Sequence, residues 1–262
     1  WALLAVAVLT AGASLATFRA LRRGRRLAQL KSAFVANVSH ELRTPLASIL
    51  MLAENLEAGR VADEAGRVRY HALIRREAER LRRLVADVLD FSRLERGKGL
   101  ELRREALDVD ALAAGLREEA LAWAQRAGFE LAIDVEPADG RVEVDPDALR
   151  RSVVNLLENA RKHSGEGGAT LSLHVVPDEL VVAVEDAGRG VPEEARARVF
   201  EAFTRLERDD GAAGTGLGLA IVREIARAHG GDVVLRPGSA GRGARFELRL
   251  PLLQAVEEEV TA

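Results

Sequence analysis

Residues 37 to 46 read Asn-Val-Ser-His-Glu-Leu-Arg-Thr-Pro-Leu and place one histidine, His40, inside a helical pattern. Pro45 lies in the same pattern and has no N–H to donate to the carbonyl of Glu41, so we expect the helix to bend or loosen just after His40. An imidazole beside a carboxylate at such a bend predicts a site that other groups must reach. The helical pattern itself rests on apolar residues at three- and four-residue steps, namely Leu27, Leu30, Phe34, Val38, Leu42, Leu46 and Ile49.

The helical pattern extends in both directions from this stretch. Residues 20 to 58 form one predicted helix and residues 64 to 96 a second, with Gly59 and Asp63 in the turn between them. A hairpin with one apolar face cannot bury that face alone, so we expect two copies to form a homodimeric four-helix bundle. The run 96–99, Arg-Gly-Lys-Gly, is the predicted linker, and the hairpin region as a whole is predicted to span 19–97. The apolar stripe of the second helix consists of Leu81, Leu84, Val85, Val88 and Phe91.

The first 18 residues, 1–18, carry no charge. At 1.5 Å per residue they reach roughly 27 Å, close to the hydrocarbon thickness of about 30 Å. A basic run without an acid follows, which by the positive-inside rule predicts the end of a transmembrane helix with a cytoplasmic flank. A buried core helix or a truncated span is the alternative interpretation. A chain that starts with Trp1 is expected to be a fragment or a processed product. The basic residues are Arg19, Arg22, Arg23, Arg25, Arg26 and Lys31.

From residue 100 to 252 the pattern changes to mixed helices and strands. The elements do not alternate strictly between strand and helix, so we predict an α+β two-layer sandwich. Asp108 is the expected cap of the first helix, and 253–262 form an acidic tail. We expect helices at 109–126, 146–163, 192–200 and 217–229, and strands at 100–105, 129–135, 141–144, 171–176, 180–185, 233–236 and 244–250.

Composition narrows the classes of function. The net charge of −3 argues against a general nucleic-acid binder. The absence of cysteine excludes disulfide scaffolds and cysteine-ligated metal sites. We therefore expect no nucleic-acid partner.

Four stretches of the second half carry residues suited to a nucleotide, and the first lies on the helix at 146–163. Asn155 and Asn159 are four residues apart and share a helix face, and amide oxygens suit Mg²⁺. Glu158, Lys162 and His163 lie beside them, and Lys162 can reach a phosphate as a point charge. Two solvated asparagines on a helix surface are the alternative.

The second and third stretches follow the strand at 180–185. Asp186 can accept a hydrogen bond from an exocyclic amine such as that of adenine, while Gly188 and Gly190 let the backbone approach a ligand. Further on, Phe203 and Arg205 belong to the run Phe-Glu-Ala-Phe-Thr-Arg at 200–205, two aromatic residues before a polar loop.

The fourth stretch opens the helix at 217–229, where glycines expose backbone amides for phosphate. It follows a polar loop and not a strand, so it does not match a dinucleotide fingerprint. Its residues are Gly214, Thr215, Gly216, Leu217 and Gly218.

Together and in this order, the four stretches resemble the asparagine box, first glycine box, phenylalanine box and second glycine box of the sensor histidine kinase catalytic domain. Residues 39–46 resemble the phosphoacceptor box of the same family, and the resemblance covers 27–250. It implies the ATPase fold shared with DNA gyrase, ATP and Mg²⁺ as ligands, phosphorylation of His40, and transfer to an aspartate in the receiver domain of a response regulator. Ala187 departs from the pattern, because many members have Asn there.

The resemblance also implies roles for individual residues. Asn159 would hold Mg²⁺, Asn155 and Lys162 would contact phosphates, Asp186 would read adenine, and 204–215 would form a mobile lid. Glu41 would orient His40 or act as its base, and Glu41-Leu-Arg-Thr44 resembles the pattern of members that also dephosphorylate their regulator.

Two alternatives stay open, a catalytically inactive signalling scaffold and a serine kinase of the same ATP fold. The other histidines are interpreted as structural or peripheral. His71 and His174 lie on a helix and a strand, His163 borders the predicted pocket, and His229 ends a helix, where a partial positive charge would suit the dipole.

Overall fold

The computed structural model describes residues 1–61, 63–165, 167–204, 215–239 and 241–253, and for 2–11, 13–16, 20 and 23–34 it describes the backbone alone. The chain divides into two compact units, of which the first contains Trp1–Leu84 and the second begins at Val85. Two predicted site residues, Arg205 and Gly214, lie outside the described residues, as do most of the predicted lid and the acidic tail.

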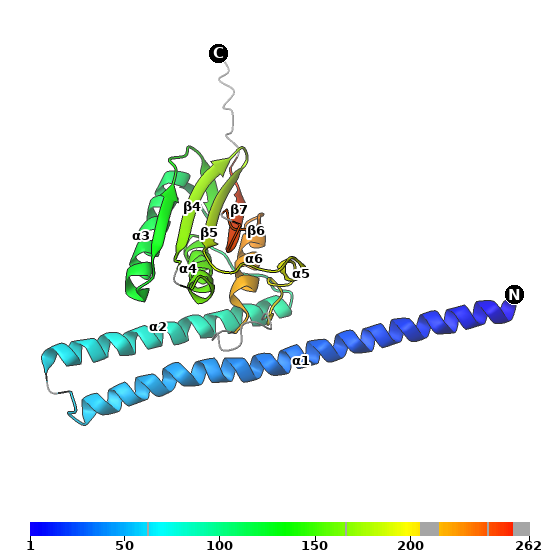
Figure 1. Cartoon of the computed structure of the whole chain (residues 1–262), viewed down its shortest axis with the longest axis horizontal. Coiled ribbons are helices and arrows are strands. Elements are labelled where there is room, and N and C mark those ends of the chain that lie inside the picture. The colour runs from blue at the N-terminus through cyan, green and yellow to red at the C-terminus, as the bar shows by residue number, and fades with distance from the viewer. Residues whose placement is uncertain (62, 166, 205–214, 240, 254–262) are drawn as a thin grey trace, which may run out of the picture. The chain divides into compact units, whose positions relative to one another are not determined.

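The predicted helical hairpin is confirmed. Helix α1 (Ala2–Glu57) and helix α2 (Glu64–Glu95) are separated by a short turn in which Gly59 adopts a φ of 64° (Figure 1). Helix α1 runs without interruption through Pro45, so the proline does not end it. The segment 1–18 is part of this same long helix and is not a separate one.

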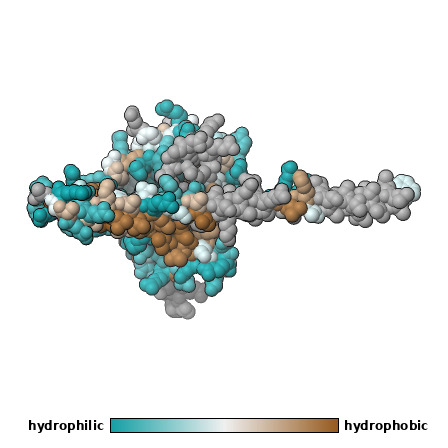
Figure 2. Space-filling model, turned by 90° about the horizontal axis from the view of Figure 1, so that it is seen from below, coloured by the Kyte–Doolittle hydropathy of each residue, from teal (hydrophilic) through white to brown (hydrophobic). Residues whose placement is uncertain are grey.

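The hairpin exposes large apolar side chains in the isolated chain. Leu46 on α1 is 49% exposed, and Leu50 and Met51 one turn later are each 55% exposed. Figure 2 shows apolar side chains gathered in a band along the helices. Contiguous apolar surface of this kind marks an interaction site.

Within the described part of the chain, no helix combines the length and the apolar character needed to cross a membrane. The prediction of a transmembrane helix end at 1–18 is therefore not confirmed.

The second unit has the predicted two-layer α+β architecture. A five-stranded sheet in the order β2-β4-β5-β7-β6 forms one layer, and helices α3 (Val109–Ala127), α4 (Pro146–His163) and α6 (Gly218–Ala228) form the other (Figure 1). Only β2 and β4 pair in parallel. The strands of this sheet are β2 (Leu131–Val135), β4 (Ala169–Val176), β5 (Glu179–Asp186), β6 (Asp232–Pro237) and β7 (Ala244–Pro251).

The core lies between these two layers, because each helix presents an apolar face to one side of the sheet. Leu149, Leu156 and Leu157 of α4 are fully buried against Leu180 of β5 and Leu248 of β7 in one apolar cluster. Burying a leucine side chain contributes about 1.5–3 kcal/mol, so α4 is held firmly by this face while its other face is left for polar residues.

Three local predictions are wrong. The strand predicted at 100–105 begins only at Glu105: it is β1 (Glu105–Asp108), which pairs with β3 (Arg141–Val144) in a separate antiparallel ladder. Before this strand, the backbone N–H of Arg103 donates to the Asp145 carboxylate at 2.8 Å and not to a neighbouring strand. Asp108 makes no side-chain cap bond to the described first turn of α3 and instead pairs with Arg141 at 3.5 Å. The helix predicted at 192–200 is only the single turn α5 (Glu193–Arg196).

Candidate active site

His40 lies on the exposed surface of α1. The neighbouring hydroxyls are turned to the helix backbone, since Ser39 donates to the carbonyl of Val35 at 2.7 Å and Thr44 donates to the carbonyl of His40 at 3.3 Å. The imidazole is therefore open to a reaction partner from solvent or from another domain, as the sequence predicts.

Glu41 faces a different direction from its neighbour. Its side chain is buried, and its Oε2 accepts a hydrogen bond from Nη2 of Arg80 on α2 at 3.1 Å. Consecutive residues of an α-helix do not face each other, so the helix period turns Glu41 toward α2 and leaves His40 outside. The structure thus shows Glu41 as half of an ion pair that joins the two helices of the hairpin.

Helix α4 positions the predicted phosphate and metal ligands. Asp145 caps this helix by accepting from the backbone N–H groups of Asp147 and Ala148, each at 3.0 Å, which is the preferred role of Asp at an N-cap. Asn155 and Asn159 lie two turns and one turn, respectively, before the end of α4, and both are half-buried on its polar side. Lys162, at the last turn, is exposed.

The side-chain amide of Asn155 has an unsatisfied hydrogen-bond donor. Its Nδ2 is buried, and no acceptor among the described residues lies within hydrogen-bond distance. A buried donor without a partner costs about 1–3 kcal/mol, and a phosphate or nucleotide acceptor would remove that cost. A Cβ placed on Gly218 would lie 3.8 Å from Cγ of Asn155, so the start of α6 is next to this amide.

Asp186 ends strand β5 with a buried carboxylate. Its Oδ1 accepts from the N–H of Gly188 at 2.9 Å and from the N–H of Ala244 at 3.3 Å. Burial raises the pKa of this carboxyl group, and the two backbone amides oppose that rise. Two donors fix one oxygen, so the orientation of the carboxylate is set before any ligand arrives.

The first glycine stretch packs against its neighbours at positions where a side chain does not fit. A Cβ on Gly188 would lie 2.2 Å from the carbonyl oxygen of His163, and one on Gly190 would lie 2.6 Å from that of Gly243. Gly190 also has a φ of 72°, which favours glycine. The structure therefore brings the end of α4, the loop after β5 and the turn before β7 together around Asp186.

Phe203 joins the third stretch to the fourth. Its backbone N–H donates to the carbonyl of Gly216 at 3.0 Å, and its φ of 67° makes it the one non-glycine residue with positive φ in the described chain. Leu217, next in the fourth stretch, is fully buried. Thr215 is also buried but belongs to the other compact unit.

Comparisons with known proteins agree with this geometry. The model of histidine kinase-, DNA gyrase B- and HSP90-like ATPases matches residues 144–254, and the model of the His Kinase A (phospho-acceptor) domain matches residues 30–97. The chain belongs to the sensor histidine kinases.

Individual relatives support the assignment to this family. The sensor protein DivL of Caulobacter vibrioides is 38% identical over 227 residues, which are 86% of this chain and 29% of DivL. The probable sensor histidine kinase TcrY of Mycobacterium tuberculosis is 39% identical over 226 residues, 84% of this chain and 45% of TcrY. The crystal structure of full-length ShkA in complex with AMPPNP has a TM-score of 0.58 at 35% identity and covers 86% of this chain and 45% of ShkA. This sensor histidine kinase chain thus spans less than half of those relatives.

Some residues that contact Asp186 were not predicted from the sequence. Ala244 donates to Asp186, and Gly243 adopts a φ of 82° where a Cβ would lie 1.8 Å from the carbonyl oxygen of Asp186. The glycines at 241 and 243, just before a predicted strand, were the available signal. The hydrogen bond of Ala244 to Asp186, 58 positions earlier, is a long-range contact that no local pattern reveals.

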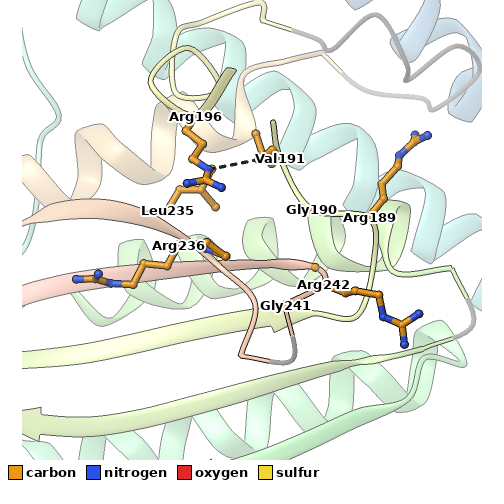
Figure 3. Close-up of a pocket in the computed structure, with 10 residues that line it drawn as sticks. Arg189, Gly190, Val191, Arg196, Leu235, Arg236, Gly241 and Arg242 are labelled. Carbon is orange, nitrogen blue, oxygen red and sulfur yellow. Dashed lines mark hydrogen bonds between the residues drawn. The ribbon is translucent and has the colours of Figure 1, made fainter. Parts of the chain in front are cut away.

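A pocket of about 110 Å³ lies beside the first glycine stretch, between the loop at 189–196 and the turn that joins β6 to β7. Figure 3 shows that Arg196 is turned inward, where its Nε donates to the carbonyl of Val191 at 3.3 Å. The side chains of Arg189, Arg236 and Arg242 extend in different directions. Because these guanidinium groups do not converge, the pocket is not built around one anion.

Proposed function

We propose that this chain is the catalytic core of an ATP-dependent protein-histidine kinase that phosphorylates His40 and passes the phosphoryl group to an aspartate of a response regulator. The observation that carries the proposal is the buried carboxylate of Asp186, with one oxygen held by two backbone amides and thus oriented to accept from the exocyclic amine of adenine. ShkA, which resembles this chain at 35% identity, is recorded in complex with the ATP analogue AMPPNP.

The polar face of α4 would hold the phosphates. Asn159 would offer its amide oxygen to Mg²⁺, a cation that takes oxygen ligands and shares them with phosphates. The unpartnered Nδ2 of Asn155 would donate to a phosphate oxygen, and Lys162 would add a positive charge. When bound, Mg²⁺ neutralises the charge that develops during phosphoryl transfer.

His40 would carry out the attack. A neutral ring nitrogen forms the new P–N bond in line with the breaking P–O bond, and ADP leaves with the bond electrons. The ring then loses the proton on its other nitrogen to water or to Glu41. Since Glu41 is paired with Arg80 at 3.1 Å, a direct role as base requires that this carboxylate first leave the pair, whereas an orienting role does not.

Incorporation of labelled phosphate from ATP tests the proposed reaction. His40→Gln should abolish incorporation and leave ATP binding intact, because His40 belongs to the first compact unit and the predicted ATP site to the second. His71→Gln is the matched control, since His71 is also exposed and lies on α2. Label that resists acid would indicate a serine kinase, and label that persists in His40→Gln would reject His40 as acceptor.

We infer a second activity, dephosphorylation of the regulator, from the hydroxyl of Thr44. This residue is exposed one turn after His40 and could orient water toward an aspartyl phosphate. The hydrogen bond of Thr44 to the carbonyl of His40 at 3.3 Å supports the competing view that Thr44 only shapes the helix before Pro45. Thr44→Ala should keep autophosphorylation and lose phosphatase activity, and Thr44→Ser should keep both. Equal rates of decay of the phosphorylated regulator with wild type and with Thr44→Ala would contradict a role of Thr44 in dephosphorylation.

We further propose that the chain works as a homodimer through the exposed apolar residues of the hairpin.

We also propose that the first 18 residues are the end of a helix that anchors the chain in the inner (cytoplasmic) membrane, with the catalytic core in the cytoplasm. The uncharged run 1–18 followed by six basic residues supports the attachment. Flotation with anionic lipid vesicles tests it. Loss of flotation after deletion of 1–18 is expected, and flotation that survives the deletion would reject this segment as the anchor.

A further inference from the structure

Helix α1 lacks one backbone hydrogen bond immediately after His40. Pro45 lies inside this helix, and a proline has no N–H to donate to the carbonyl of the residue four positions earlier, which is Glu41. An interior proline ordinarily kinks or loosens a helix at such a place. Helix α1 nevertheless continues as one helix from Ala2 to Glu57. The turn that carries His40 therefore depends on contacts other than the backbone hydrogen bonds of α1.

Arg80 of α2 makes such a contact, and it makes it with Glu41. Its Nη2 donates to Oε2 of Glu41 at 3.1 Å, and both residues belong to the same compact unit. The side chain of Glu41 is only 10% exposed. Pro45 is four residues after Glu41, so it lies on the same face of α1, and it is also buried. The ion pair thus holds the residue whose carbonyl has lost its helical donor.

Arg80 is itself oriented by a second carboxylate. Its Nη1 lies 3.9 Å from Oε2 of Glu77, one turn earlier on α2. A guanidinium group presents its donors in a rigid planar fork, so a group that faces Glu77 with one nitrogen has a defined direction toward Glu41 with the other. Arg80 therefore connects a carboxylate of each helix and ties α1 to α2 directly beside His40.

The other side-chain contact in this turn stays within α1. The hydroxyl of Thr44 donates to the carbonyl of His40 at 3.3 Å, which is long for a hydroxyl donor, and it does not connect α1 to α2. Phosphoryl transfer requires the attacking nitrogen to be in line with the breaking bond, and a small displacement of the attacking group costs rate. The contact between Arg80 and Glu41 is thus the one that fixes the position of the reacting turn on the hairpin.

We propose that Arg80 is a positioning residue for the phosphorylation of His40, because its ion pair with Glu41 replaces the backbone support that Pro45 removes from this turn of α1. The inference rests on the proposed kinase function and extends it to a residue of α2. Arg80 acts through Glu41 and does not touch the reacting atoms. Glu41 serves this purpose without leaving the pair.

Autophosphorylation of the full chain at saturating ATP tests the role of Arg80. Arg80→Gln should lower the initial rate on the order of fivefold, because a partly exposed ion pair contributes modestly, and should leave the KM for ATP unchanged. Arg80→Lys retains a positive charge but not the planar fork and should recover part of the rate. Arg76→Gln is the matched control and should keep the wild-type rate, since Arg76 is 64% exposed and lies 3.9 Å from Glu77 on the same helix. A folded Arg80→Gln variant with a loss smaller than about twofold would overturn the proposal.

Hydrogen exchange of the backbone amides at 41–46 measures the support without using kinase activity. Arg80→Gln should accelerate exchange in this segment of the full chain. Pro45→Ala restores an N–H for the carbonyl of Glu41, so in that background Arg80→Gln should accelerate exchange much less. Equal acceleration in both backgrounds would refute the link between Arg80 and Pro45. A wild type that incorporates no phosphate would reject the kinase function, whereas the exchange measurement would still decide on the support by Arg80.

Discussion

Replacement of Asp186 by asparagine separates the two functions of this carboxylate. One oxygen, Oδ1, accepts from the backbone of Gly188 and Ala244 and so holds the loop after β5 against the start of β7. In the proposed function the other oxygen accepts from the amine of adenine. Asparagine retains an acceptor for the backbone but presents an NH₂ donor to the amine.

The size of the effect follows from these contacts. A hydrogen bond to a charged group contributes about 1.5–3 kcal/mol, so its loss should weaken ATP binding roughly 10- to 150-fold. The unfolding midpoint of Asp186→Asn should change little, because both backbone bonds can persist. Asp186→Ala, in contrast, leaves two buried N–H groups without an acceptor, which costs about 1–3 kcal/mol for each group, and should lower both affinity and stability.

Calorimetric titration with ATP·Mg²⁺, together with thermal unfolding of each variant, measures both effects. A pH series adds a further test. Because burial raises the pKa of Asp186, the affinity of wild type should begin to fall at a higher pH than an ordinary aspartate would give, and this dependence should vanish in Asp186→Asn. An Asp186→Asn variant that binds ATP within about twofold of wild type would refute the assignment of the adenine contact.

Three further outcomes are expected. Asn159→Ala should weaken ATP binding in the presence of Mg²⁺ and much less in EDTA; equal losses in both titrations would contradict a metal ligand. Burial lowers the pKa of His229 below its ordinary value, so the unfolded chain binds more protons than the folded chain below about pH 6.5. The free energy of unfolding should therefore decrease as the pH is lowered through that range, by at most about 1.4 kcal/mol per pH unit. His229→Gln should reduce this slope between pH 7.5 and 5.5 (about one unit either side of that value), and an unchanged slope would count against His229. Leu84→Asp places a charge in the apolar stripe of the hairpin and should shift sedimentation from dimer to monomer, whereas an unchanged dimer would show that this stripe is not the interface.

The sequence predicts those elements whose cause is local. The α4 helix is an example, since the pair Asp145-Pro146 supplies an N-cap and a first-turn proline and buried leucines repeat along one face. Glycines at positions that need a positive φ or a close approach of the backbone, such as Gly190, can also be recognised in the sequence. The fold class and the family followed from these signals because each arises within a few residues of the chain.

His229 shows where local reasoning fails. A histidine at a helix end is expected to carry a proton that suits the dipole. In the structure its Nδ1 donates to the carbonyl of Ile225 at 2.7 Å, and its Nε2 accepts from the N–H of Asp145 at 2.9 Å. The second contact spans 84 residues and requires a neutral ring, so the long-range partner reverses the charge state that the dipole would favour.

The end of α2 shows the same limit in a different form. Helical periodicity assigns Asp87, Asp90 and Phe91 to faces of a helix, but it does not say what covers each face. An aspartate on a helix surface is ordinarily a solvated residue, and Phe91 is predicted as one more member of the apolar stripe. Only the fold brings Arg151, 64 positions beyond Asp87, to those carboxylates. Since a charge is buried in a protein only where a hydrogen-bonded or charged partner compensates it, the burial of Asp87 depends on its contact with Arg151.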